Sequence, residues 1–237
     1  MDILSSLLVV GFAALVHTSF QLSVSVLTLM SGHAISAKKS HKRLLHLTTG
    51  YIAGAKIATL LLVSTISLII LDTVGTQPPE LLWAVTCGLL VGIGIAVWAF
   101  YYRKGKGTGL WIPRSFARHL ETRSKATDSA AESFSLGLST VMSEILFIIG
   151  PLFVAGLTLV TLPPLWQLVG IAIYTVISSL SLLIVWVLIS GGHSLSKIQK
   201  WREANKRFLQ FVGGSGLLIL GFYAYVTEVL ARTAGGM

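Results

Sequence analysis

Long apolar blocks restrict the fold of this sequence more than any other feature. Each block is long enough to cross a hydrocarbon core of about 30 Å as a helix, and a backbone in lipid must satisfy its own hydrogen bonds. The composition agrees, because only 11% of the 237 residues are charged and 54% are hydrophobic. We therefore predict an all-α polytopic membrane protein, a single transmembrane domain over residues 1–237. Its six predicted transmembrane helices lie at about residues 3–31, 46–71, 81–102, 132–160, 165–190 and 208–230.

Basic residues are sorted by loop, and this sorting predicts the orientation of the chain. All of the 18 Lys and Arg except Lys56 and Arg232 lie in the loops after the first, third and fifth blocks. Basic loops stay on the cytoplasmic side, so we expect both termini outside the cell membrane. Because the formal charge of +9 is divided among these loops, we expect no basic face for nucleic acid.

Two weak internal matches predict that the chain is built from two similar halves. The segments "CGLLVGIG" and "SGLLILGF" place Gly88 opposite Gly216, and at nearly the same separation Thr18 falls opposite Glu144. Three spans in each half make the halves inverted, an arrangement typical of secondary transporters. A chance match between Leu-rich and Gly-rich helices is the alternative. The predicted parts are repeat one at residues 1–102, a basic linker at 103–130 and repeat two at 131–237.

The basic linker is predicted to contain an amphipathic helix. In "WIPRSFARHLETRSKA", residues 111–126, the apolar residues Ile112, Phe116 and Leu120 recur every four positions among arginines and lysines. One apolar face and one basic face favour a helix lying on the inner leaflet, where anionic lipid attracts it.

Polar residues inside the apolar blocks are candidates for function, because placing them in lipid is unfavourable. In the first block, four polar residues follow a helical spacing and share one predicted face: His17, Gln21, Ser25 and Thr28. Such a face is expected to turn toward the bundle or toward water. In the fourth block, Ser143 and Glu144 interrupt a long apolar run.

Two ionisable residues, Lys56 and Glu144, are predicted to lie near the membrane midplane. Each is about 15–18 Å along its block at 1.5 Å per residue, and opposite charges at similar depth are expected to pair. The alternative is an ion pair or hydrogen-bonded group that only holds the helices in register. The predicted substrate-binding or proton-binding site consists of His17, Gln21, Lys56, Ser143 and Glu144.

Proline and glycine positions predict where helices bend or approach each other. Pro151 cannot donate a backbone hydrogen bond, so we predict that Gly150 and Pro151 form a hinge in the fourth block. Glycines four residues apart let helices pack closely. Two such steps are predicted to be packing contacts, Gly50 to Gly54 and Gly88 to Gly92.

The six-span plan and the segment "RFLQFVGGSGLLILGFYAY", residues 207–225, resemble the lysine-exporter superfamily. That superfamily includes exporters of amino acids, manganese and cadmium, and carriers of thiol electrons. The resemblance implies an exporter of a small cationic or zwitterionic solute, and it indicates no branch. Cys87 is the one cysteine, whereas thiol carriers need one in each half. The first block lacks the proline break that is typical of the amino-acid exporters. Glu144 is the one acidic residue at mid-depth, whereas the manganese and cadmium exporters rely on such residues in both halves.

Sequence motifs for an enzyme, a cofactor or a built-in ATPase are absent, since neither G-x-x-x-x-G-K-[ST] nor H-E-x-x-H occurs. His17 and Glu144 are too few ligands for a tight transition-metal site.

We therefore predict a secondary transporter that exports an amino acid or a metal ion, with proton coupling and a homodimer left open. Its expected partners are the lipid bilayer and the solute. The alternatives are a non-transporting membrane subunit or scaffold, and an intramembrane enzyme acting on lipid.

Overall fold

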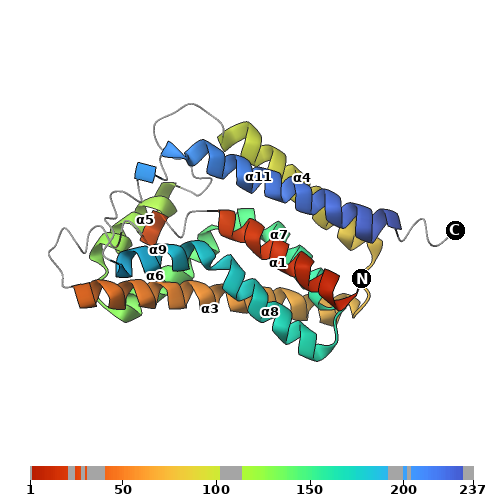
Figure 1. The fold of residues 1–237 in the computed structure, drawn as a ribbon, viewed down its shortest axis with the longest axis horizontal. Coiled ribbons are helices and arrows are strands. Elements are labelled where there is room, and N and C mark those ends of the chain that lie inside the picture. The colour runs from red at the N-terminus through yellow and green to blue at the C-terminus, as the bar shows by residue number, and fades with distance from the viewer. Residues whose placement is uncertain are drawn as a thin grey trace.

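The computed structural model describes residues 2–20, 25–27, 30, 41–101, 114–191, 200–201 and 204–231. Every regular element in these residues is helical (Figure 1), which confirms the predicted all-α class. The α-helices are α1 (Ile3–Ser19), α3 (His41–Val74), α4 (Glu80–Tyr101), α5 (Arg114–Ala126), α6 (Ala130–Ser143), α7 (Ile145–Leu159), α8 (Pro164–Ser178), α9 (Leu180–Ser190) and α11 (Lys206–Ala224). A π-helix, η1 (Tyr225–Leu230), follows α11 directly.

Three to five segments of the described chain are long and apolar enough to cross a membrane, judged by length and composition. Helix α3, most of α4, and α11 together with η1 qualify as single helices. Two further candidates are bent pairs, α6 with α7 at 80° and α8 with α9 at 51°. Helix α1 is apolar but shorter. These features are those of a membrane protein.

The helices form an elongated bundle with most loops gathered at its two ends. In Figure 1, α1 begins and η1 ends at the same end of the molecule, where the α3–α4 and α7–α8 turns also lie. Helix α5 lies at the opposite end, where α3 begins and α9 ends. Helices α4 and α11 pack side by side, and α3 packs along α6.

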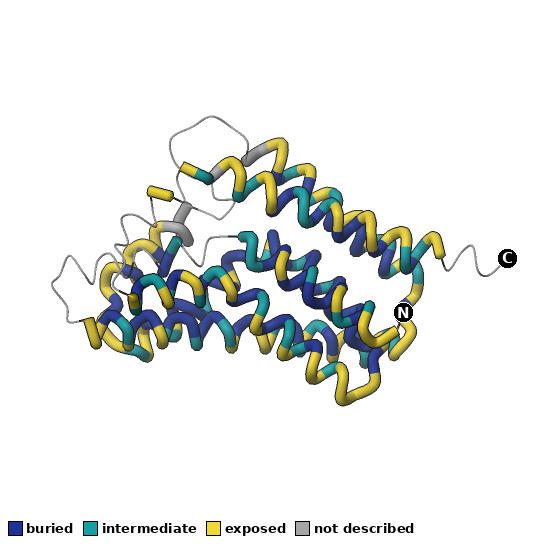
Figure 2. The backbone as a smooth tube through the Cα atoms, viewed as in Figure 1, coloured by how far each residue is buried: buried dark blue, intermediate teal, exposed yellow. Residues whose placement is uncertain are grey.

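Burial follows the inner faces of the helices, and the outer faces are apolar. Figure 2 shows the buried residues concentrated where α1, α3, α6, α7 and α9 face one another. Large side chains on the outside include Leu8, Leu81 and Leu168, which are 65%, 74% and 66% exposed. Exposed apolar surface of this extent suits contact with lipid rather than with water.

Glycines allow α3 and α6 to approach at backbone distance. A Cβ at Gly54 would collide with the carbonyl oxygen of Phe134, and a Cβ at Gly137 would collide with that of Tyr51. A Cβ at Gly50 would lie 2.9 Å from the carbonyl oxygen of Ala130. The predicted packing step from Gly50 to Gly54 is therefore confirmed.

The second predicted pair of packing glycines makes no contact with another helix within the described chain. Gly88 and Gly92 lie on the exposed side of α4, and a Cβ at either would meet no atom within 4 Å. The contact of α4 with α11 uses another face instead, where Gly94 lies against Leu218 and Gly214. Spacing alone could not show which glycine-bearing face of α4 would meet a neighbour.

The first apolar block is not the single helix that its composition predicts. Helix α1 ends at Ser19, and Phe20 is extended with φ −81° and ψ 129°. The Ser19 hydroxyl donates to the carbonyl of Val16 at 2.6 Å, and the Phe20 amide donates to that of His17 at 3.2 Å. These bonds satisfy the end of the helix locally. Gln21 and Thr28 lie outside the described residues.

The amphipathic helix predicted in the basic linker is present as α5. Leu120 is buried, and Arg118 and Arg123 are exposed, as the pattern requires. Ile112 lies outside the described residues, and the position of the helix on the inner leaflet stays a prediction.

Replacing Gly137 with alanine should destabilise the protein, because the new methyl group would push α6 away from α3. Overpacking of this kind costs about 1–3 kcal/mol, although alanine favours a helix over glycine by about 1 kcal/mol. We expect a lower Tm in thermal unfolding of the purified protein in detergent. Gly88→Ala is the matched control and should leave Tm unchanged or raise it. Equal Tm values for the two variants would contradict the proposed role of the α3–α6 contact.

Candidate functional site

Three helix breaks meet in the interior of the bundle. Helix α1 ends at Ser19, the α6–α7 pair breaks at Glu144, and the α8–α9 pair breaks at Ser179. The ring of Phe20, just past α1, stacks on Phe147 in the first turn of α7 with centroids 5.2 Å apart. The end of α1 therefore packs directly against the start of α7.

The break at Glu144 bends the fourth block by 80°, and Glu144 itself keeps backbone hydrogen bonds on both sides of it. Glu144 has φ −86° and ψ −5°, its amide donates to Val141 at 3.1 Å, and its carbonyl accepts from Ile148 at 3.2 Å. The Ser143 hydroxyl donates to the carbonyl of Thr140. These bonds matter because water is not available to satisfy a broken helix in an apolar interior.

The large bend does not lie at the predicted hinge. Gly150 and Pro151 are both buried inside α7, which continues to Leu159. A Cβ at Gly150 would lie 2.7 Å from Leu90, so close packing against α4 holds this segment. The bend lies instead at Glu144, before the proline rather than at it.

Hydroxyl groups accompany the second break, at Ser179. The hydroxyls of Ser178 and Ser179 both donate to the carbonyl of Thr175, at 3.3 and 3.0 Å. Ser179 has φ −92° and ψ 2°, and its amide donates to Val176 at 3.3 Å. Serine and threonine hydroxyls that bond back to carbonyls in this way often bend helices.

The last turn of α1 is tied to the second break by side chains. His17 Nδ1 lies 3.0 Å from the hydroxyl of Tyr174, and both residues are buried. One residue later, the Thr18 hydroxyl donates to Ser181 Oγ and accepts from the Ser181 amide, each at 3.2 Å. Together these bonds hold the imidazole beside the α8–α9 break.

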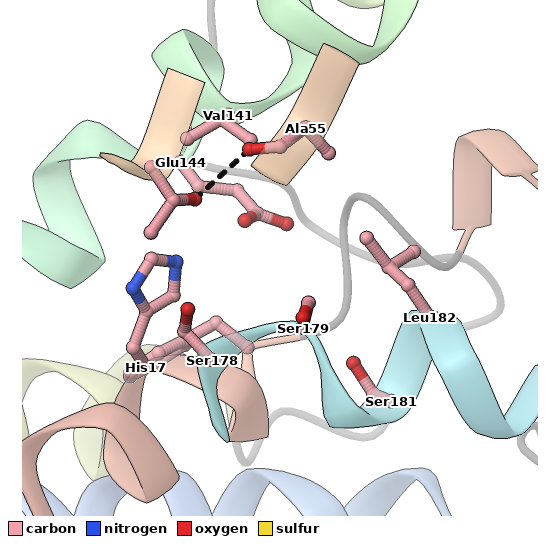
Figure 3. Close-up of a pocket in the computed structure, with 10 residues that line it drawn as sticks. His17, Ala55, Val141, Glu144, Ser178, Ser179, Ser181 and Leu182 are labelled. Carbon is pink, nitrogen blue, oxygen red and sulfur yellow. Dashed lines mark hydrogen bonds between the residues drawn. The ribbon is translucent and has the colours of Figure 1, made fainter. Parts of the chain in front are cut away.

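A small cavity lies where the three breaks meet. Glu144 enters it from the α6–α7 break and His17 from α1, and Glu144 is only 2% exposed. Figure 3 shows the carboxylate of Glu144, the imidazole of His17 and the hydroxyl of Ser178 turned toward this space. The cavity has a volume of about 20 Å³, which is of the order of one water molecule. Its lining is His17, Phe20, Ala55, Thr59, Val141, Glu144, Ser178, Ser179, Ser181 and Leu182.

The structure brings two of the five predicted site residues into one cavity. His17 and Glu144 both line it, whereas Ser143 lies beside it with its hydroxyl on Thr140. Gln21 lies outside the described residues.

Lys56 does not join this cavity, and the predicted pairing with Glu144 is wrong. Helix α3 contributes Ala55 and Thr59 to the lining, and Lys56 is half-buried on the neighbouring face. Within the described chain, no ion pair connects Lys56 to Glu144. The depth estimate ignored rotation about the helix axis, where one residue turns the side chain by about 100°.

Sequence reasoning overlooked the contribution of the fifth block. The segment "TVISSLS", residues 175–181, places four hydroxyl residues in an otherwise apolar run. Three of them, Ser178, Ser179 and Ser181, line the cavity, and Tyr174 just before them holds His17. The density of hydroxyls in an apolar block was the available signal.

Comparison with protein-family models, with curated proteins and with solved structures finds no match for this chain. In the described residues there is also no group of three or more His, Cys, Asp and Glu placed to hold a metal ion. The chemistry of the cavity therefore has to be argued from its own side chains, which are one carboxylate, one imidazole and several hydroxyls.

Replacing Tyr174 with phenylalanine should weaken the link between α1 and α8. The change removes the hydroxyl that lies 3.0 Å from His17 and leaves a buried ring nitrogen without that partner. A net loss of about 1 kcal/mol in the free energy of unfolding is expected for one such bond. Thermal unfolding in detergent would measure it. Tyr223→Phe, at a tyrosine that is 45% exposed on α11, is the control and should leave Tm unchanged. Equal shifts in both variants would argue against the link.

Proposed function

We propose that this protein is a secondary transporter whose binding site for a small cation is the cavity among the three helix breaks. The observation that carries the proposal is the buried carboxylate of Glu144 at the broken centre of a candidate span. An ionisable group inside a membrane is unfavourable and is usually functional. Discontinuous helices that present polar groups to a central site are typical of transporters.

The lining of the cavity favours a proton or a small hard cation as the bound species. Its polar groups include the Glu144 carboxylate and the hydroxyls of Thr59, Ser178, Ser179 and Ser181, which are oxygen ligands. Lys56 is not there to bind a carboxylate, which removes the main reason to expect an amino-acid zwitterion. A volume near that of one water suits a proton or Na⁺. Export as the direction rests on the resemblance to the lysine-exporter superfamily.

As part of this proposal, the chain crosses the membrane six times, in two inverted halves. The arrangement of the helices supports this plan. The start of α1 and the end of η1 lie at one end of the molecule (Figure 1), where an even number of crossings would place them. The internal match sets Thr18 against Glu144, and both lie where a helix ends or breaks. The proposed third spans of the two halves, α4 and α11, pack against each other.

The breaks also supply a means of access to the site. A change of angle at Ser179 would move α9 and open the cavity toward one side of the membrane. Binding of a cation at Glu144 would favour whichever arrangement of the helices holds it best. In the same proposal, His17, held by Tyr174, forms the wall opposite Glu144.

Glu144→Gln tests the proposal, because glutamine keeps the shape of the side chain and removes its charge. Wild-type protein in proteoliposomes should move protons or Na⁺ down an imposed gradient, followed with an entrapped pH-sensitive dye and with radioactive Na⁺. We expect the variant to lower this flux at least about ten-fold, since a charged ligand is replaced by a neutral one. The variant should still purify as a folded, monodisperse protein.

Glu228→Gln is the matched control for that experiment. Glu228 is also buried, at 6% exposed, but it lies in η1 and not at the cavity. Its replacement should leave the flux within about two-fold of wild type, because no ligand of the site is lost. Unchanged flux in Glu144→Gln, or equal loss in both variants, would contradict the assignment of the site.

A non-transporting subunit or scaffold is the second candidate, and the small size of the cavity favours it. A volume of about 20 Å³ and the bonds of His17 and Thr18 would then serve only to hold the helices together. In that case wild-type protein would give no flux with either cation, and a partner protein would copurify with it in a fixed ratio.

A further inference from the structure

A second and larger cavity lies outside the broken-helix site, between α5 and α6. Its volume is about 180 Å³, below the roughly 300–1,000 Å³ of sites for drug-sized ligands. It therefore suits a small polar group. Its lining is His119, Leu120, Arg123, Ala126, Thr127, Glu132, Ser135, Leu136 and Ser139.

The α5 wall of this cavity carries hydrogen-bond donors. His119 and Arg123 are four residues apart, so they share one face of α5, and both are exposed. Within the described chain, Arg123 forms no ion pair. Lys125, by contrast, already has a partner, because its ammonium donates to the Glu121 carboxylate at 2.7 Å. That hydrogen bond lowers the pKa of the Glu121 carboxyl. The guanidinium of Arg123 can therefore bind an anion.

The α6 wall carries hydrogen-bond acceptors. Glu132 Oε2 accepts from the amides of Asp128 and Ser129 at 2.8 and 3.3 Å in the capping box of α6, which leaves Oε1. The hydroxyl of Ser139 donates to its own helix, at the carbonyl of Ser135, and that of Thr127 donates to the backbone carbonyl of Arg123. The oxygen lone pairs of Ser139 can still accept. The two walls thus differ in polarity, one cationic and one accepting.

The walls are held in place by contacts from a third helix. Arg43, near the start of α3, donates to the carbonyl of Asp128 at 3.1 Å and lies 3.7 Å from its carboxylate. Asp128 belongs to the short turn between α5 and α6, so this contact fixes the angle at which the two walls meet. A site of stable shape follows from this anchoring.

We propose that this cavity binds a zwitterion with a phosphate and a primary ammonium, the phosphoethanolamine headgroup of a membrane lipid. Arg123 and His119 would donate to the phosphate, and Glu132 with the hydroxyl of Ser139 would accept from the ammonium. A simple anion fits less well, because it would meet the Glu132 carboxylate. A cation alone would meet the arginine.

The position of the cavity favours a lipid over a free solute as the source of this group. Helix α5 is amphipathic and lies at the end of the bundle where α3 begins and α9 ends (Figure 1). Candidate spans therefore stop at this level, and headgroups lie where transmembrane helices end. A free zwitterion such as phosphoethanolamine has the same chemistry, so the experiment must separate the two sources.

The test is calorimetric titration of the full-length protein in a neutral detergent with dihexanoyl phosphatidylethanolamine. Dihexanoyl phosphatidylcholine has the same chains and phosphate but no N–H donors, and we expect it to bind at least about ten-fold more weakly. Free phosphoethanolamine forms the third arm. If the ethanolamine lipid binds and free phosphoethanolamine does not, the cavity is a site for a lipid headgroup. If both bind equally, the ligand is a free zwitterion. Either result supports the proposed chemistry.

Two arginines on the same helix provide matched variants. Arg123→Gln should weaken binding of the ethanolamine lipid about ten-fold or more, because it removes a charged donor from the cavity. Arg118→Gln changes net charge equally but lies outside the lining, and it should keep the wild-type affinity within two-fold. Equal weakening by both variants would show only diffuse attraction and would overturn the proposal.

A third variant tests the accepting wall. Glu132→Gln keeps an oxygen for the capping box, so α6 should still fold, but it removes the negative charge. We expect the preference for the ethanolamine over the choline lipid to fall to about two-fold or less. An unchanged preference, or no measurable binding of the ethanolamine lipid to wild type, would overturn the assignment.

Discussion

Backbone hydrogen bonding inside an apolar bundle is the constraint on which this structure depends. A helix that ends in such surroundings leaves amides and carbonyls that water cannot satisfy, at a cost of several kcal/mol for each group. At each break the chain meets this demand with a serine hydroxyl that donates to a carbonyl three or four residues earlier, from Ser19, Ser143 and Ser179. The breaks can therefore lie together in the interior and enclose a polar cavity.

The fold combines this bent region with one long unbroken support. Helix α3 runs for 34 residues past the cavity, and the glycines at 50, 54 and 137 bring the backbone of α6 directly against it. Such contact leaves α6 little room to move relative to α3. Helix α7, on the far side of the break, is also held by packing, with Gly150 against Leu90 of α4 and Gly156 against Ile66 of α3. The cavity thus lies at the break that joins two closely packed helices.

Apolar periodicity was sufficient to predict the helical class, the helices α3, α4 and α11, and the amphipathic α5. It could not predict the breaks, because apolar composition continues across them. Hydroxyl residues alone do not reveal a break either: Thr59 and Ser67 bond back to carbonyls at 3.0 and 2.8 Å within the unbroken α3. Depth along a block predicted Glu144 and Lys56 at one level, and Glu144 is indeed buried, but depth could not give the rotation of Lys56, which depends on how α3 packs.

The position of Glu144 at a break gives its buried carboxylate a favourable electrostatic surrounding apart from Lys56. Glu144 is the N-cap residue of α7, although its side chain makes no hydrogen bond to the amides of that helix. The aligned peptide dipoles place roughly half a positive charge at that end, which favours an anion in the first turn. In an unbroken helix the same residue would have no such field. The break therefore provides both the space of the cavity and the electrostatic support of its charged group.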